Sequence, residues 1–300
     1  MTTDNETLVS PEDMKSTPGG GAAFNGSADD AIGGLLLRAG KFKQGDLERV
    51  LKLQKEKNLR FGEAAIQLRL ATEKDIQRAL AQQYQYPYVA DAKSLSPKLV
   101  AAIDPFSPET EALRAARTQL LLGWFSAGRK FLAVGAPSER EDSGALAANL
   151  AVLFAQLGKK TLLIDANLKQ PGLHSLFKLG NASGLSELLA GRMQHPATSA
   201  VQPFQTLSLL SAGSPPPNPS ELLLRASFDF LFDETLQAFD VVLIDTPSAQ
   251  TSADFQIIAA RAVGMLIAAR RNVSRVNDLA DMKAKILATG AEIVGAVMTA

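Results

Sequence analysis

The chain has 300 residues, 31 basic and 31 acidic side chains, and no cysteine. Zero net charge gives no general attraction to nucleic acid or to an anionic membrane surface. Without cysteine there are no disulfides, zinc–thiolate sites or thiol catalysis. The two histidines, His174 and His195, are not spaced as a metal pair. We therefore expect no zinc, no haem and no nucleic-acid partner.

Residues 1–29 are rich in Thr, Ser, Gly and acidic residues. This composition predicts a disordered tail, and its early acidic residues are unlike a signal peptide. No apolar run in the sequence reaches the roughly 20 residues that span a bilayer. We therefore expect a cytoplasmic protein that reaches the inner face of the cell membrane only through a partner.

Residues 30–90 contain an internal repeat. Gly33 and Asp46 in the first copy match Gly62 and Asp75 in the second, at a constant spacing of 29 residues. Each copy is predicted to be a short helix, a turn and a second helix, and Thr72 is a good capping start for the last of these. Two copies predict a small helical domain with one shared core.

The repeat resembles the N-terminal domain of type II secretion and pilus-assembly ATPases. In some of those proteins two motifs, each opening Arg-Leu-Gly, bind cyclic di-GMP. Here the second motif opens Arg60-Phe-Gly62, whereas the first opens Ala-Ile-Gly33 and lacks the arginine. The resemblance implies Gly33, Arg60 and Gly62 as residues for cyclic di-GMP. The alternative is a docking domain in which the apolar positions only form a core.

Residues 91–108 are punctuated by serine and proline and are predicted to be a linker. A helix is predicted from Glu109 to Leu122. It carries Glu111, Arg114 and Arg117, spaced three residues apart on one face. Glu111 and Arg114 can pair with each other or across subunits.

The rest of the chain, residues 109–300, alternates apolar strands with helical stretches. This pattern predicts an α/β domain, a P-loop NTPase-like parallel sheet covered by helices on both faces and preceded by the small all-helical domain. The expected strands are Phe131–Val134, Thr161–Ile164, Leu207–Leu210, Val241–Ile244, Val263–Ala268 and Ile293–Met298.

Ligands of such sheets bind beyond the carboxyl ends of the strands. Asp165 and Asp245 each follow a strand, and the loop from Pro137 to Gly144 follows a third. We expect the three to meet at one crevice. The structural alternative is that both aspartates only cap strand ends.

The loop has the position of a P-loop between a strand and a helix, but its phosphate-binding residues are replaced. A P-loop needs glycines, a Lys for the phosphates and a Ser or Thr for Mg²⁺. Here the Lys position falls on Ser143, the hydroxyl position on Gly144, and the preceding glycine is Asp142. Segment 139–142, Glu-Arg-Glu-Asp, has a net charge of −2. Two like charges about 5 Å apart cost roughly 3 kcal/mol near a protein surface, so this loop should repel a triphosphate.

Beyond the loop, the domain resembles the bacterial tyrosine kinases (BY-kinases), and in particular those encoded with exopolysaccharide machinery. The resemblance rests on several stretches in order and on the Glu-x-x-Arg-x-x-Arg helix, which fits the family's subunit-contact motif. The matching stretches are Thr161–Lys169, Gly184–Gly191, Pro217–Leu223 and Phe239–Pro247.

The resemblance implies roles for individual residues. Asp245 would end the Walker B strand and hold Mg²⁺ through water, and Asp165 would assist Mg²⁺ or take the tyrosine proton. A second acid of that motif is here Asn167, and the arginine after it is Lys169. In an active kinase, Arg140 or a lysine from a neighbouring subunit would have to replace the missing lysine. The nucleotide positions would then be Pro137, Arg140, Ser143, Gly144, Asn167 and Lys169, and the subunit contact Glu111, Arg114 and Arg117.

Three functions stay open at this point. The first is a degenerate, non-catalytic kinase relative that assists exopolysaccharide assembly and export, docked on a transmembrane chain-length regulator or on a related active kinase. The second is an active tyrosine kinase that uses ATP and Mg²⁺. The third is a cyclic di-GMP sensor. A homo-oligomer is compatible with each.

Overall fold

The computed structural model describes residues 32–84, 87–89, 94–181 and 183–299, apart from the side chains of 234–236. The predicted tail, residues 1–29, lies outside the described residues. The chain divides into two compact units, with the boundary between Gln83 and Tyr84. Among the described residues, no helix combines the length and apolarity that a membrane crossing requires.

The first unit consists of helices that share one small core. The same hydrogen bond opens the second helix of each copy of the repeat. The backbone N–H of Lys43 donates to the Asp46 carboxylate at 2.8 Å, and that of Thr72 to the Asp75 carboxylate at 2.9 Å. These bonds satisfy donors that a helix start leaves open. The helices are α1 (Ile32–Arg38), α2 (Asp46–Lys57), α3 (Phe61–Gln67) and α4 (Glu73–Gln83).

The repeated glycines lie where two helices approach closely. A Cβ atom on Gly33 would lie 2.5 Å from Cδ1 of Leu47, and one on Gly62 would lie 2.8 Å from Cγ2 of Ile76. Both distances are shorter than carbon atoms tolerate, so a side chain at either position would force Leu47 or Ile76 to shift.

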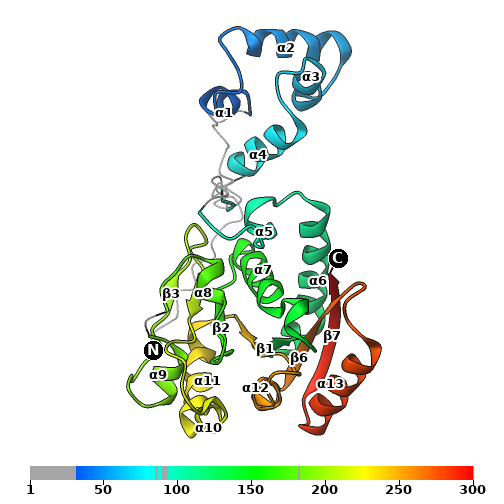
Figure 1. Ribbon diagram of the computed structural model, residues 1–300. Helices are drawn as coiled ribbons and strands as arrows, with labels where there is room; N and C mark the ends of the chain where they lie inside the picture. Colours follow the sequence, from blue (N-terminus) through cyan, green and yellow to red (C-terminus); the bar gives the residue numbers. More distant parts are fainter. Residues whose placement is uncertain (1–31, 85–86, 90–93, 182, 300) are drawn as a thin grey trace, which may run out of the picture. The chain divides into compact units, whose positions relative to one another are not determined.

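The second unit is built on a seven-stranded sheet (Figure 1). Its strands are parallel except for the short β3, which runs antiparallel at one edge. This is the predicted α/β fold of a P-loop NTPase-like domain. The strand order is β3 (Ser199–Ala200), β4 (Leu207–Leu210), β2 (Thr161–Asp165), β5 (Val241–Asp245), β1 (Phe131–Gly135), β6 (Gly264–Arg270) and β7 (Glu292–Thr299).

The six predicted strands agree with the structure to within two residues at each end, and β3 was not predicted. The edge strand β3 was missed because it has only two residues and both are exposed. Val263, predicted to open a strand, instead ends the preceding helix in the left-handed conformation with φ of 62°.

Helices cover both faces of the sheet, and each face has its own apolar core (Figure 1). The helix that follows the phosphate loop, α7, is buried along nearly its whole length on one face. On that face lie α5 (Val100–Ile103), α6 (Pro108–Gly123), α7 (Ser143–Gln156) and α8 (Leu173–Leu176). The other face carries α9 (Leu185–Leu189), α10 (Pro219–Leu223), α11 (Ala226–Ala238), α12 (Asp254–Ala262) and α13 (Val276–Ala288).

Residues 94–108, predicted to be a linker, belong to the second unit. Leu95 and Leu99 are buried in the core that covers α7. Asn149 of α7 accepts the backbone N–H of Ala101 at 2.9 Å and donates to the carbonyl of Lys98 at 2.8 Å. The serines and prolines of this segment suggested a linker, but its leucines and alanines pack as part of the domain.

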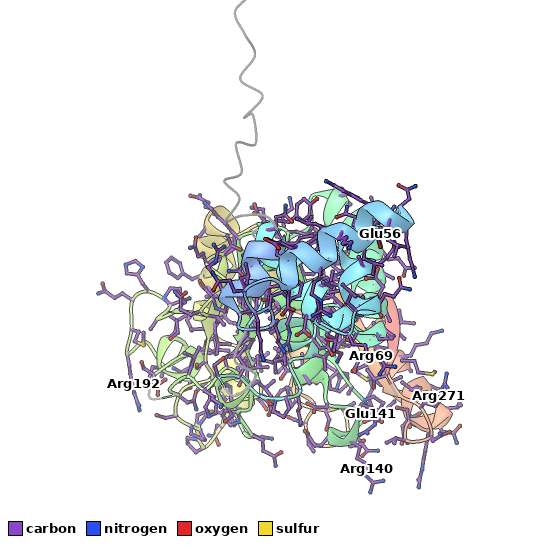
Figure 2. The ribbon with its side chains drawn as sticks, turned by 90° about the horizontal axis from the view of Figure 1, so that it is seen from above. Glu56, Arg69, Arg140, Glu141, Arg192 and Arg271 are labelled. Carbon is purple, nitrogen blue, oxygen red and sulfur yellow. The ribbon has the colours of Figure 1, made fainter. Side chains whose placement is uncertain are left out.

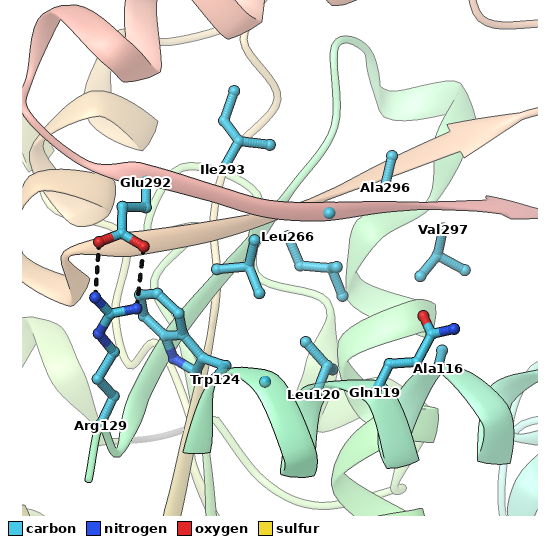
Figure 3. A pocket seen from close by; sticks show the side chains of 13 residues that line it. Ala116, Gln119, Leu120, Trp124, Arg129, Leu266, Glu292, Ile293, Ala296 and Val297 are labelled. Atoms are coloured by element: carbon cyan, nitrogen blue, oxygen red, sulfur yellow. Dashed lines mark hydrogen bonds and ion pairs between the residues drawn. The ribbon is translucent and has the colours of Figure 1, made fainter. Parts of the chain in front are cut away.

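Trp124, just after α6, packs against the first residues of β1 and β6 (Figure 3). Its indole N–H donates to the carbonyl of Phe131 at 2.8 Å. The Arg129 guanidinium lies 4.1 Å from the ring centroid and forms two bonds, of 3.0 and 2.7 Å, with Glu292 of β7. The indole also leaves no room beside Gly264, where a Cβ would lie 2.2 Å from the ring.

Gly264→Ala should therefore destabilise the second unit, by about 1–3 kcal/mol as for other overpacked cores. Gly295→Ala is the matched control in the neighbouring strand, because its new Cβ would lie an ordinary 3.8 Å from Leu266. Chemical denaturation of both variants measures the difference. Equal stabilities would show that Trp124 moves aside without cost.

Candidate functional site

Two carboxylates meet at the carboxyl edge of the sheet. Asp165 ends β2 and Asp245 ends β5, and the two are register partners in adjacent parallel strands. Asp165 is fully buried and Asp245 is 6% exposed. Their proximity is the one predicted from the strand ends.

Asp165 has its oxygens occupied by backbone donors. One accepts the N–H of Asn167 at 3.2 Å, and the other accepts those of Gly172 and Leu173, each at 3.0 Å. Burial raises the pKa of Asp165, and these three bonds oppose the rise. The carboxylate thus holds together the loop that follows β2.

Asp245 is held from the phosphate loop. The Ser143 hydroxyl donates to its Oδ1 at 2.9 Å. Burial raises the pKa of Asp245 well above its ordinary value, and the charge of Asp165 raises it further. The Ser143 bond is too weak an opposing effect to reverse this direction.

The phosphate loop directs its donors inward, onto its own acids. Residues Glu139–Glu141 form a short 3₁₀ turn, η2, and Glu141 is 3% exposed. The Glu141 carboxylate accepts the Ser138 N–H at 3.0 Å, the Ser138 hydroxyl at 2.6 Å and the Ser274 hydroxyl at 2.8 Å. Donors that a P-loop aims at phosphate are here satisfied by a buried carboxylate.

Asp142 caps α7 at the position expected for a glycine. Its backbone is left-handed, with φ of 53°, and its side chain accepts the N–H of Ala145 at 3.3 Å. Its other oxygen lies 2.5 Å from Nζ of Lys98. No local sequence signal points to this lysine, because 44 residues separate the partners and the serines and prolines of its segment predict a linker.

Arg140, the predicted replacement for the loop lysine, projects outward from the body of the molecule (Figure 2). It lines a cavity of about 630 Å³ with Arg270 and Arg275, and its carbonyl accepts a bond from Arg270 at 3.4 Å. Pro137, at the start of the loop, is buried, and its carbonyl accepts the N–H of Gln250 at 3.0 Å.

The two remaining positions implied for the nucleotide lie after β2. The Asn167 side chain accepts the N–H of Gln170 at 3.2 Å and so stabilises a turn. Lys169 is exposed, and its ammonium lies 3.4 Å from the hydroxyl of Ser252, in the loop after β5. Both therefore lie at the same edge of the sheet as the two aspartates.

The predicted subunit-contact residues make bonds within the chain. Arg114 pairs with Glu111 at 2.8 Å on the surface of α6. Arg117 reaches the carbonyl of Leu153 in α7 at 3.4 Å. Assembly through these residues stays a prediction.

The residues predicted for cyclic di-GMP lie in the helical unit. Gly33 and Gly62 pack against neighbouring helices, as described above. Arg60 is exposed, and its backbone N–H donates to Glu63 at the start of α3. Recognition of a cyclic dinucleotide by Arg60 stays a prediction.

The residues present do not fit the Mg²⁺–ATP arrangement of a P-loop. Gly144 has no hydroxyl for Mg²⁺, and a Cβ at this position would lie 3.1 Å from Oδ2 of Asp245. The loop has no lysine, and Asp165 is occupied by backbone donors. Within the described ranges, no group of three or more His, Asp or Glu side chains is arranged to hold a metal ion.

Comparison with known proteins identifies relatives that match about two thirds of the chain. No family model matches the chain. The tyrosine-protein kinase YwqD of Bacillus subtilis is 32% identical over 200 residues, which are 67% of this chain and 84% of that protein. The chain belongs to the bacterial tyrosine kinase family. Another relative, the tyrosine-protein kinase wzc of Salmonella typhimurium, is 29% identical, and the match covers 28% of its length.

Solved structures of BY-kinases share the fold. The kinase domain of the Escherichia coli tyrosine kinase ETK superposes with a TM-score of 0.66 at 25% identity, covering 72% of this chain and 85% of that one. The chimerical protein CapA2B2 gives a TM-score of 0.64 at 29% identity, covering 74% and 97%.

The carboxylate pair should make stability depend on pH. Because the pKa of Asp245 is raised on folding, the folded BY-kinase domain binds that proton more tightly than the unfolded chain. This contribution to stability is lost as pH rises through the folded-state pKa. Asp245→Asn removes the titration. Relative to the unchanged chain, the variant should gain stability between about pH 4 and about pH 8, by about 1.4 kcal/mol for each unit of raised pKa.

Denaturation with urea in the presence of EDTA, at both pH values, measures this gain. Asp240→Asn, at the exposed position just before β5, is the control for losing one acid. A gain that does not change with pH would show that Asp245 titrates as in the unfolded chain.

Proposed function

We propose that this chain is a non-catalytic member of the BY-kinase family. It acts as an assembly or regulatory component of exopolysaccharide biosynthesis and export. In this role the kinase-like domain is a docking body, and its partner is a transmembrane chain-length regulator or a related active kinase.

The observation that carries the proposal is the internal satisfaction of the phosphate loop. Glu141 accepts donors of the loop, and Asp142 caps the helix whose N-terminus would face a phosphate. A triphosphate would have to displace two carboxylates of its own charge sign. Each is held by hydrogen bonds, and no lysine of the loop compensates for the repulsion.

The carboxylate pair also supports the proposal. Phosphoryl transfer depends on Mg²⁺ held by aspartates that are ionised and open to the metal. Here both oxygens of Asp165 accept backbone N–H groups of the loop after β2. Its role is consistent with that of a strand-end cap.

The cellular role rests on the resemblance to BY-kinases encoded with exopolysaccharide machinery. The second unit retains the family's sheet and both helical layers although its loop is altered. A docking role needs the folded kinase-like domain but not its phosphate-binding residues. An active kinase of the same family then supplies the chemistry.

Titration calorimetry with Mg²⁺-ATP tests the proposal. The purified chain, at low salt and at high protein concentration, should give no binding heat and no thermal shift. Incubation with labelled ATP should likewise transfer no phosphate to the chain. Asp245→Ala is measured in parallel, because a site of the kinase type must depend on this residue.

Micromolar binding by the unchanged chain that disappears in Asp245→Ala would contradict the proposal. It would instead support the alternative hypothesis of an ATP-dependent tyrosine kinase. Binding that survives in Asp245→Ala would lie outside the kinase site and would leave the proposed function standing.

A further inference from the structure

We propose that Asp142 is an internal anion that takes the place of a bound polyphosphate at the phosphate loop. Its counter-ion, Lys98, lies outside the loop and is the cation of this site. This inference rests on the proposed function and deepens it, because it names the contact that keeps the site closed to phosphates. The ligand class that the site would take without Asp142 is a di- or triphosphate anion.

The Asp142 carboxylate bridges the two kinds of group that a P-loop offers to phosphate. One oxygen accepts a backbone N–H at the start of α7, from Ala145, and the other lies 2.5 Å from the Lys98 ammonium. Helix N-termini and lysines are the groups that bind phosphates in P-loops. A single carboxylate therefore satisfies both, and it does so without a ligand.

The backbone at Asp142 has a conformation that favours glycine. Its φ of 53° and ψ of 57° lie in the left-handed region, which glycine adopts without strain and which aspartate tolerates better than most residues. An Asp142→Gly variant can therefore keep this backbone conformation while it removes the carboxylate.

Lys98 is fixed to α7 by buried contacts. Its carbonyl accepts a bond of 2.8 Å from Asn149, a residue that is 4% exposed. Three residues further on, Ala101 donates to the same side chain. On the other side, Ser96 donates its N–H to the carbonyl of Leu176 at 2.9 Å. The backbone of Lys98 is therefore fixed beside the loop, and only its side chain has to move to reach a bound anion.

The ion pair between Lys98 and Asp142 is open to solvent. The side chains of Lys98 and Asp142 are 58% and 39% exposed, and ion pairs so open to water contribute little to stability. An exposed lysine on an anchored backbone can exchange one anion for another. The other acids of the loop, Glu139 and Glu141, add to the repulsion that an incoming phosphate meets.

Removal of Asp142 should open the site to phosphates through Lys98. We expect Asp142→Gly to bind inorganic pyrophosphate at least tenfold more tightly than the unchanged chain in titration calorimetry at low salt. The double variant Asp142→Gly, Lys98→Met should lose this gain. Lys159→Met in the Asp142→Gly background controls for the loss of one positive charge, because Lys159 lies beyond the opposite end of α7, and it should keep the gain.

Two further measurements guard against a folding defect. Thermal unfolding of Asp142→Gly verifies that the domain is intact. Asp142→Asn removes the negative charge but keeps a side chain that caps α7 and tolerates the left-handed backbone. Its affinity for pyrophosphate should rise less than that of Asp142→Gly, and this rise should also depend on Lys98. Repeating the titrations with Mg²⁺-ATP distinguishes a site for pyrophosphate alone from one that also accepts a nucleotide.

A folded Asp142→Gly variant with no gain would overturn the inference, and so would a gain that persists in the double variant. Neither result affects the proposed function, which concerns the unchanged chain. Conversely, ATP binding by the unchanged chain that depends on Asp245 would contradict the proposed function, whatever the Asp142 variants show.

Discussion

The register between β2 and β5 is the constraint on which the site depends. Parallel pairing places Asp165 and Asp245 side by side at the same edge of the sheet, under helices that exclude water. Two carboxylates in this position repel each other and lose hydration, so the surrounding loops must supply donors. The loop after β2 gives its N–H groups to Asp165, and the loop after β1 gives the Ser143 hydroxyl to Asp245. Both loop conformations therefore follow from the burial of acids.

The phosphate loop follows the same rule. A buried or half-buried donor needs an acceptor, and in a nucleotide-binding protein that acceptor arrives with the ligand. In this chain Glu141 and Asp142 are part of the loop and are always present. The loop can therefore be ordered without a ligand, which is a different requirement from that of a P-loop. The remaining body of a BY-kinase, with its sheet and two helical layers, needs no change to accommodate these substitutions.

The predictable part of the structure was the part set by apolar periodicity. Apolar periodicity predicts the six longer strands and the helix with Glu111. The convergence of Asp165 with Asp245 follows because the ends of parallel strands share one edge of the sheet. Local chemistry also revealed that the loop lacked its lysine. What sequence reasoning could not find were contacts between distant residues. Lys98 lies in a segment whose serines and prolines suggested a linker, and Arg140 was chosen as the substitute lysine only because it is near in sequence. The position of a side chain relative to the loop depends on tertiary packing, which no local pattern encodes.

The segment ahead of α6 has a consequence for how the kinase-like domain is isolated. Gln156 of α7 donates to the carbonyls of Pro87 and Ala101, at 2.9 and 3.1 Å, and Leu99 fills the core beside it. A fragment cut at residue 109, where the family resemblance in the helix begins, would leave α7 with an uncovered apolar stripe, and Asn149 and Gln156 would lose their bonds to Pro87, Lys98 and Ala101. The smallest fragment that keeps these contacts with α7 must begin at or before Pro87.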